Sequence, residues 1–221
     1  MIIVHHLNDS RSQRVLWLLE ELGLPYEVKR YQRDKKTSLA PAALRAIHPL
    51  GKSPVIEDGD IRVAETGAII EYLLEAHGNG RLKPAAGTAE ARRFTYWLHY
   101  AEGSAMTPLL LKLVFSQLPK RSPLLIRGIV KAVSDKVQQT FIDPQIATHI
   151  SYWEDELGRS EGFAGDAFSA ADIMMSFPLE AAGSRVPFGA DRPRIKAFLE
   201  RIHARPAWQK ALERGGPYSY G

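Results

Sequence analysis

The sequence is 221 residues long and 45% hydrophobic, which suffices to bury a substantial core in one large or two small domains. It contains no cysteine, so disulfides, thiolate metal sites and a cysteine nucleophile of the protein's own are excluded. The net charge of +4 is modest, and no apolar run approaches the roughly 18 residues of a membrane span, so we expect no membrane partner.

The first elements predict a β-α-β unit. Residues 2–7 are a β-prone run without the basic start or the long apolar stretch of a signal peptide, and we therefore expect a cytoplasmic protein. Apolar residues then recur at helical spacing up to Leu22, and Gly23 followed by Pro25 ends that helix. Residues 26–31 alternate like a strand, and two parallel strands joined through a helix require a right-handed crossover.

A hairpin and a helix complete this first part, after a short helix expected at residues 42–47. Two β-prone runs, 55–57 and 61–63, flank the turn signal Asp58-Gly59. A helical pattern then covers residues 65–77. The expected order of elements is therefore β-α-β-α-β-β-α.

Glycine and proline concentrate in residues 78–87, and no convincing strand follows them. Such stretches are typical of domain boundaries. We therefore expect one domain over residues 1–80, a linker over residues 81–87 and an all-helical domain over residues 88–221.

The pattern of the second part is helical throughout. Pro108 is expected to kink or break its first long helix. Residues 124–157 form a second long helical region, with a bend near Pro144. Ser169 and Asp172 make a capping box that opens a buried-looking helix. Two final helices are expected, at residues 192–203 and 206–214.

Basic residues concentrate in the middle of the helical part: Lys112, Lys120, Arg121, Arg127, Lys131 and Lys136. Pro119 and Pro123 interrupt the cluster, and no aromatic series is interleaved with it. Stacking aromatics are what single-stranded nucleic acid requires, so we expect a solvated surface and no nucleic-acid partner.

Four segments of the sequence resemble the cytosolic glutathione transferases: residues 10–26, residues 49–55, Glu65-Thr66, and residues 163–172. Each motif is weak alone, but all four occur in the right order across essentially the whole chain. The resemblance implies an α/β thioredoxin-like N-terminal domain (βαβαββα) followed by an all-α C-terminal helical domain. The first segment looks most like bacterial and fungal members that lack a catalytic tyrosine.

The resemblance also implies a binding site for glutathione. Ser53-Pro54 would be a cis peptide bond, and the Val55 backbone would pair with the cysteinyl unit of the tripeptide. Thr66 and the helix N-terminus would bind the γ-glutamyl carboxylate, and Glu65 would bind the ammonium group. Lys52 would reach the glycine carboxylate.

The residue that activates the glutathione thiol is expected in the loop after the first strand. A thiol has a pKa of about 8.5, so a hydroxyl donor and the positive end of the first helix must stabilise the thiolate. Ser10 is the first candidate for that donor, Ser12 is the runner-up, and a main-chain or Asn8 donor stays open. Asp9 would repel a thiolate, whereas Arg11 would add positive charge.

A second substrate is expected between the two domains, against the helix that begins near Thr88. The residues expected to line its pocket are Trp97, Tyr100, Ser104, Met106 and Thr107. His5 and His6 lack a carboxylate or cysteine companion at ligand spacing, so we expect no metal.

The leading functional prediction is a glutathione transferase that conjugates glutathione to electrophilic small molecules, and reduction of organic hydroperoxides stays open beside conjugation. The alternative is a non-catalytic module of the same fold that binds a ligand or takes part in an assembly. Use of glutathione as a cofactor for isomerisation or dehalogenation also stays open. The resemblance implies a homodimer in which the helix over residues 65–77 faces the partner's helical domain.

Overall fold

The computed structural model describes residues 1–34, 36–37 and 39–220. Its first part contains a four-stranded sheet with the order β2-β1-β3-β4. The strands are β1 Ile2–Leu7, β2 Tyr26–Tyr31, β3 Val55–Asp58 and β4 Ile61–Ala64. β1 and β2 are parallel, and the other two pairs are antiparallel, as the expected β-α-β unit and hairpin require. The predicted thioredoxin-like arrangement is confirmed.

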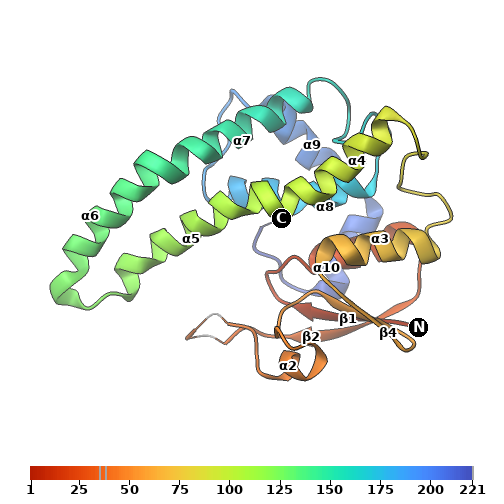
Figure 1. Ribbon diagram of the computed structural model, residues 1–221, viewed down its shortest axis with the longest axis horizontal. Helices are drawn as coiled ribbons and strands as arrows, with labels where there is room; N and C mark the ends of the chain where they lie inside the picture. The colour runs from red at the N-terminus through yellow and green to blue at the C-terminus, as the bar shows by residue number, and fades with distance from the viewer. Residues whose placement is uncertain (35, 38, 221) are drawn as a thin grey trace.

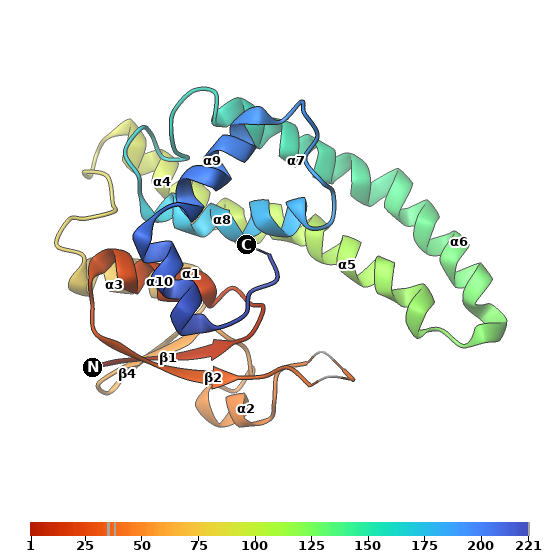
Figure 2. The same ribbon diagram turned by 180° about the vertical axis from the view of Figure 1, so that it is seen from behind.

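Three helices belong to this part: α1 Gln13–Leu22, α2 Ala43–Ile47 and α3 Thr66–His77. α1 and α3 cover the face of the sheet that looks toward the remaining helices, and α2 lies on the opposite face (Figure 2). α1 ends as expected, because Gly23 adopts a left-handed conformation with φ 62° and its N–H bonds to the carbonyls of Glu20 and Leu19.

The second part contains helices joined by loops and has no strand among its described residues. Its α-helices are α4 Ala89–Tyr100, α5 Met106–Arg121, α6 Arg127–Val137, α7 Asp143–Glu156, α8 Ala170–Gly183, α9 Pro193–His203 and α10 Pro206–Gly215. α8 is buried along nearly its whole length, whereas α5 and α6 form a hairpin that projects far from the rest of the molecule (Figure 1). None of the described helices combines the length and the apolar character needed to cross a membrane.

The helix break that was expected at Pro108 lies earlier in the chain. Pro108 lies in the first turn of α5, and the irregularity precedes it as a π-helical turn over Ala101–Ala105. A π turn adds one residue to the helical path, which accommodates a proline that cannot donate the usual hydrogen bond. The expected capping box of α8 is confirmed. The Ser169 side chain accepts from a backbone N–H of the first turn, and the Asp172 side chain accepts from the Ser169 backbone N–H.

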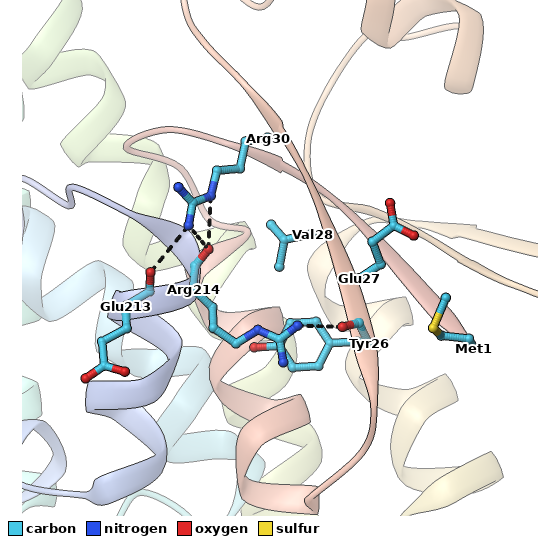
Figure 3. A pocket seen from close by; sticks show the side chains of 7 residues that line it. All are labelled: Met1, Tyr26, Glu27, Val28, Arg30, Glu213 and Arg214. Atoms are coloured by element: carbon cyan, nitrogen blue, oxygen red, sulfur yellow. Dashed lines mark hydrogen bonds between the residues drawn. The ribbon is translucent and has the colours of Figure 1, made fainter.

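α10 covers the free edge of the sheet beside β2 (Figures 2 and 3). The guanidinium of Arg214 donates to the Tyr26 carbonyl at 2.5 Å and lies 3.7 Å from the centre of the Tyr26 ring. Arg30 donates in turn to the Arg214 carbonyl at 2.6 Å. A shallow cavity of about 520 Å³ between these elements also contacts Met1, so it lies near the starts of β1 and β2. The exposed sheet edge is thereby protected from pairing with another chain.

Candidate functional site

The loop after β1 brings Ser10 and Ser12 together at the start of α1. Ser10 is 4% exposed and Ser12 is fully buried. Their hydroxyl oxygens lie 2.7 Å apart, and the Ser12 hydroxyl lies 2.8 Å from Nδ1 of the buried His6. The Ser12 N–H also donates to the Ser10 hydroxyl oxygen, at 3.3 Å. The two serines therefore form one connected network with a histidine of the first strand.

The protonation of His6 sets the direction of this network. Burial lowers the pKa of His6 to about 4, with a further contribution from Arg30, so the imidazole is neutral at neutral pH. The carbonyl of Gly215 accepts from the ring, which leaves Nδ1 as the acceptor facing Ser12. Ser12 then donates to His6, and Ser10 donates to Ser12. In this arrangement the Ser10 proton points into the protein.

Two other hydrogen-bond donors lie near the start of α1: the Asn8 side chain, which is already bonded within the protein, and the backbone N–H of Arg11, which is not. The Asn8 side chain donates to Asp9 at 3.1 Å and accepts from the Arg33 N–H at 2.8 Å, so both of its ends are engaged. The backbone N–H of Arg11 has no hydrogen-bond partner in the described part of the chain. Its guanidinium is 37% exposed and pairs with Glu102 at 2.9 Å. The Arg11 N–H is therefore available to a ligand at the positive end of the helix.

The predicted glutathione residues of the hairpin lie at the adjacent edge. Ser53-Pro54 is a cis peptide bond, as the resemblance implies. The Ser53 hydroxyl donates to the His5 carbonyl at 2.7 Å and accepts from the Leu7 N–H at 3.2 Å, which fixes the loop to the end of β1. Val55 is 1% exposed and has strands on both sides, paired with His5 and with Ala64.

The free backbone groups lie two residues before Val55. The N–H and carbonyl of Ser53 have no partner among the described residues, because β3 begins only after Pro54. Lys52 is exposed beside them. A peptide ligand would therefore meet the main chain of Ser53 rather than that of Val55.

Glu65 and Thr66 meet at the N-terminus of α3. Glu65 is exposed and has φ 72°, a conformation that costs a non-glycine residue about 1–3 kcal/mol. Thr66 is 3% exposed, and its hydroxyl accepts from Arg14 at 3.4 Å, so its own proton remains free to donate. Strain of this kind persists where the surroundings hold a residue for a ligand.

A buried arginine that the sequence did not single out lies behind Thr66. Arg14 is 1% exposed, donates to the Met174 carbonyl of α8 at 2.7 Å and pairs closely with Glu102 of the π turn. Burial would raise the pKa of Glu102, but Arg14 and Arg11 outweigh that effect and hold the pKa below its usual value. Glu102 is therefore an anion that binds two arginines of the first part to the helical part.

The residues expected to line the second-substrate pocket fall into two groups. Trp97 and Tyr100 are almost fully buried in an aromatic cluster, where Trp97 packs edge-on against Tyr100 and Phe163. The Tyr100 hydroxyl accepts from Trp153 at 3.0 Å and bonds closely to His149. Met106 is also buried.

Ser104 and Thr107, by contrast, are exposed. They belong to the π turn and the first turn of α5, close in sequence to Glu102. The geometry thus leaves these two residues accessible to a ligand.

The C-terminal tail reaches the same loop from the other end of the chain. The Ser219 N–H donates to Asp9 at 2.8 Å, and Asp9 itself has φ 48°. Tyr218 bonds to Glu180 of α8, and Tyr220 packs edge-on against Phe177 with ring centres 5.5 Å apart. Figure 2 shows the chain end beside α8. No local sequence signal pointed to this tail.

The two strand histidines are structural. His5 bonds to the Tyr31 hydroxyl at 2.9 Å, and His6 belongs to the serine network. Within residues 1–34, 36–37 and 39–220, no group of three or more histidine and carboxylate side chains is placed to hold a metal ion.

Models of two protein families match the chain. The glutathione S-transferase N-terminal domain matches residues 1–75, and the glutathione S-transferase C-terminal domain matches residues 119–206.

Related proteins agree with this. The chain is 33% identical to glutathione S-transferase 3 of Schizosaccharomyces pombe, over 97% of this chain and 88% of the relative. It is 34% identical to glutathione S-transferase 1 of Saccharomyces cerevisiae, over 97% of this chain and 95% of that relative. A crystal structure of a glutathione S-transferase from Actinobacillus pleuropneumoniae has a TM-score of 0.78 at 34% identity, covering 97% of this chain and 93% of that one. With its cis peptide bond, its strained glutamate and its sequence relatives, this chain belongs to the glutathione S-transferase family.

Proposed function

We propose that the protein joins reduced glutathione to electrophilic small molecules. The observation that carries the proposal is the convergence of free polar groups on one edge of the first domain. These groups are the main chain of Ser53, the carboxylate of Glu65, the hydroxyl of Thr66 and the N–H of Arg11. Glutathione is a tripeptide with a charged group at each end, and it needs such a combination of partners.

In this scheme each part of glutathione has its own partner. Thr66 and the first N–H groups of α3 bind the γ-glutamyl carboxylate, and Glu65 binds the ammonium group. The Ser53 main chain pairs with the cysteinyl unit, while Pro54 and Val55 shape the strand end beneath it. Lys52 reaches the glycine carboxylate. A sphingomonad glutathione S-transferase of the same fold, 22% identical with a TM-score of 0.71, is a complex with glutathione.

Calorimetric titration of glutathione tests this arrangement. Replacing Glu65 by Gln removes the charge that binds the ammonium, and we expect roughly tenfold or greater loss of affinity. Glu75→Gln is the matched control, because Glu75 is an exposed acid of the same helix. Equal affinity in both variants, or no binding by the wild type at millimolar glutathione, would contradict the proposal.

For thiol activation we propose that the Ser10 hydroxyl rotates from Ser12 to the sulfur when glutathione binds. Hydroxyl hydrogens rotate readily, and the Arg11 N–H supports the same thiolate. Ser10→Ala should then raise the pKa of bound thiol by about one unit or more and lower kcat/KM at pH 6.5. Ser12→Ala removes the competing acceptor and should leave the thiol pKa unchanged or lower. Absorbance of the thiolate against pH measures both.

The direction of the serine network also favours the alternative, a binding module without catalysis. If the Ser10 proton stays on Ser12, glutathione binds but its thiol keeps its ordinary pKa of about 8.5. Glutathione binding without any lowering of the thiol pKa would therefore establish that the protein is a non-catalytic binding module. Turnover of a model aryl halide and of cumene hydroperoxide separates conjugation from peroxide reduction.

We also propose a homodimer, supported by an exposed apolar face on the α5–α6 hairpin. Its large apolar side chains include Leu110, Val114, Leu124, Leu125, Ile129 and Val133, with Leu125 98% exposed. Exposed large apolar side chains concentrated on one hairpin are typical of an interface. Sedimentation velocity at micromolar concentration should show a dimer, and the pair Leu125→Asp with Ile129→Asp should shift it toward monomer. A monomeric wild type would contradict the proposal.

A further inference from the structure

One arginine of the helical part has no counter-ion among the described residues. Arg185 follows α8, and its Nη1 is buried without a hydrogen-bond partner among the described residues. No carboxylate in the described ranges lies within ion-pair distance of it. The Arg185 side chain is half-buried and the Tyr220 hydroxyl lies beside it, but the buried Nη1 stays unsatisfied. A buried N–H donor without a partner is costly, and an anionic ligand would relieve that cost.

Arg185 lines a cavity of about 500 Å³ between α5, α7 and the segment that joins α8 to α9. The cavity's other cations are already paired. Lys112 binds Asp143 at 2.7 Å, and Arg192 binds Asp191 at 2.9 Å. Arg185 is thus the cation of this cavity that can bind a ligand's negative charge without breaking an ion pair.

Apolar side chains line the cavity beside the ion pairs just described. Ile146, Ala147 and Ile150 contribute from α7, and Val186 and Phe188 contribute from the segment after α8. An apolar lining with a single free charge is typical of a site for a small amphipathic molecule.

A series of ring contacts connects the guanidinium to the start of α1. Burial lowers the pKa of Arg185, and the Tyr220 hydroxyl beside it raises that pKa. The Tyr220 ring packs edge-on against Phe177 with ring centres 5.5 Å apart, and the Arg11 guanidinium lies 5.9 Å from the centre of the same Phe177 ring. Arg185 is thereby joined through two rings to the loop that precedes α1.

We propose that Arg185 determines specificity by binding the carboxylate of the second substrate, so that the preferred electrophile is an apolar molecule bearing a carboxylate. The apolar body packs against the cavity wall, and the reactive carbon faces the glutathione sulfur. The proposal rests on the proposed transferase function.

The test compares an aryl α,β-unsaturated ketone that carries a carboxylate with its methyl ester. In both compounds the thiolate sulfur adds to the β-carbon, and the α-carbon takes up a proton from water, so they differ only in charge. The wild type should show a kcat/KM for the acid at least roughly tenfold above that for the ester. Arg185→Gln should reduce that ratio to near one.

Arg192→Gln is the matched control, because it removes the same charge from the same cavity but from a residue paired with Asp191 and with Ser151. It should keep the acid preference. Loss of the preference in both variants would show a general charge effect and overturn the proposal. Equal turnover of acid and ester by the wild type would overturn it as well, while leaving the transferase function intact.

A binding measurement separates this proposal from the transferase function. The saturated analogue of the acid cannot react, and its calorimetric titration should show binding to the wild type in the presence of S-methylglutathione. Arg185→Gln should weaken that binding roughly tenfold or more, and Arg192→Gln should not. If neither ketone reacts, this titration decides whether Arg185 binds the carboxylate, and turnover of the aryl halide decides the transferase function.

Discussion

Arg14 joins the two parts of the molecule through one buried guanidinium. It contacts Thr66 at the proposed glutathione site, Glu102 in the π turn and the Met174 carbonyl of α8. Such a residue serves binding and stability together, because any movement of α8 or of the π turn is transmitted to Thr66.

Replacing Arg14 by Met should lower the free energy of unfolding by about 3 kcal/mol, since it removes one partner of a buried ion pair. Arg11→Met is the control. Arg11 binds the same carboxylate but is 37% exposed, and its loss should cost less than about 1 kcal/mol. Urea denaturation of the two variants measures the difference, and equal costs would contradict the assigned role of Arg14.

His6 should make stability depend on pH in a defined direction. Its pKa is lowered from 6.5 to about 4 in the folded protein, so the unfolded chain binds more protons between these values. The contribution of His6 is therefore present above pH 6.5 and is lost as the pH falls toward 4.

Between pH 6.5 and pH 5 this loss amounts to about 2 kcal/mol. His6→Asn does not titrate, so its stability should fall less over that range. Burial raises the pKa of Asp172 to about 6, which acts in the opposite direction. For that reason the quantity to measure is the difference in unfolding free energy between the wild type and His6→Asn at each pH. Parallel pH curves would contradict the prediction.

At the scale of elements, local patterns accounted for most helices and strands. The glycine stop of α1, the Asp58-Gly59 turn and the capping box of α8 depend on residues within a few positions of one another. The π turn before Pro108 was missed because a proline signals a break without specifying which preceding residue absorbs it.

The candidate site was predictable only where its residues form short motifs. The Ser53-Pro54 and Glu65-Thr66 motifs could be read from the sequence. The partnership of Arg14 with Glu102, 88 positions apart, could not. Nor could the direction of the Ser10 hydrogen bond, which depends on burial of His6.

The capping box of α8 should be the most sensitive helix start in the molecule. Asp172 is fully buried and accepts from the N–H groups of Phe163 and Ser169, both at 2.8 Å. Asp172→Ala should lower the free energy of unfolding by about 2–4 kcal/mol, because it leaves buried donors without partners. Asp155→Ala, at an exposed acid of α7, should change it by less than about 0.5 kcal/mol. Thermal or urea unfolding monitored by circular dichroism compares them.

At the scale of the whole molecule, the first domain depends on the last helix. Trp17 of α1 is fully buried, and its ring packs edge-on against Trp208 of α10 with centres 5.1 Å apart. Arg205 adds an ion pair to Glu21 at 2.5 Å. The hydrophobic core is therefore continuous across the two parts of the chain.

A fragment of residues 1–80 should consequently fail to fold by itself, since it would expose Trp17 and the β2 edge to water. We expect a fluorescence spectrum of solvent-exposed tryptophan and no cooperative transition in urea. Adding the helical part on a separate chain should shift the emission to shorter wavelength. A cooperative transition of the fragment alone would contradict the prediction.

The bond between Ser219 and Asp9 spans 210 positions of the chain, and it sets an order for biosynthesis. The loop that carries Ser10 leaves the ribosome long before its partner Ser219. Gly215, which supports His6, is equally late. The β2 edge of the sheet therefore remains uncovered until α10 has been synthesised. The tail therefore cannot fix the loop that carries Ser10 until Ser219 has been synthesised, so the conformation of this loop is completed long after its own synthesis.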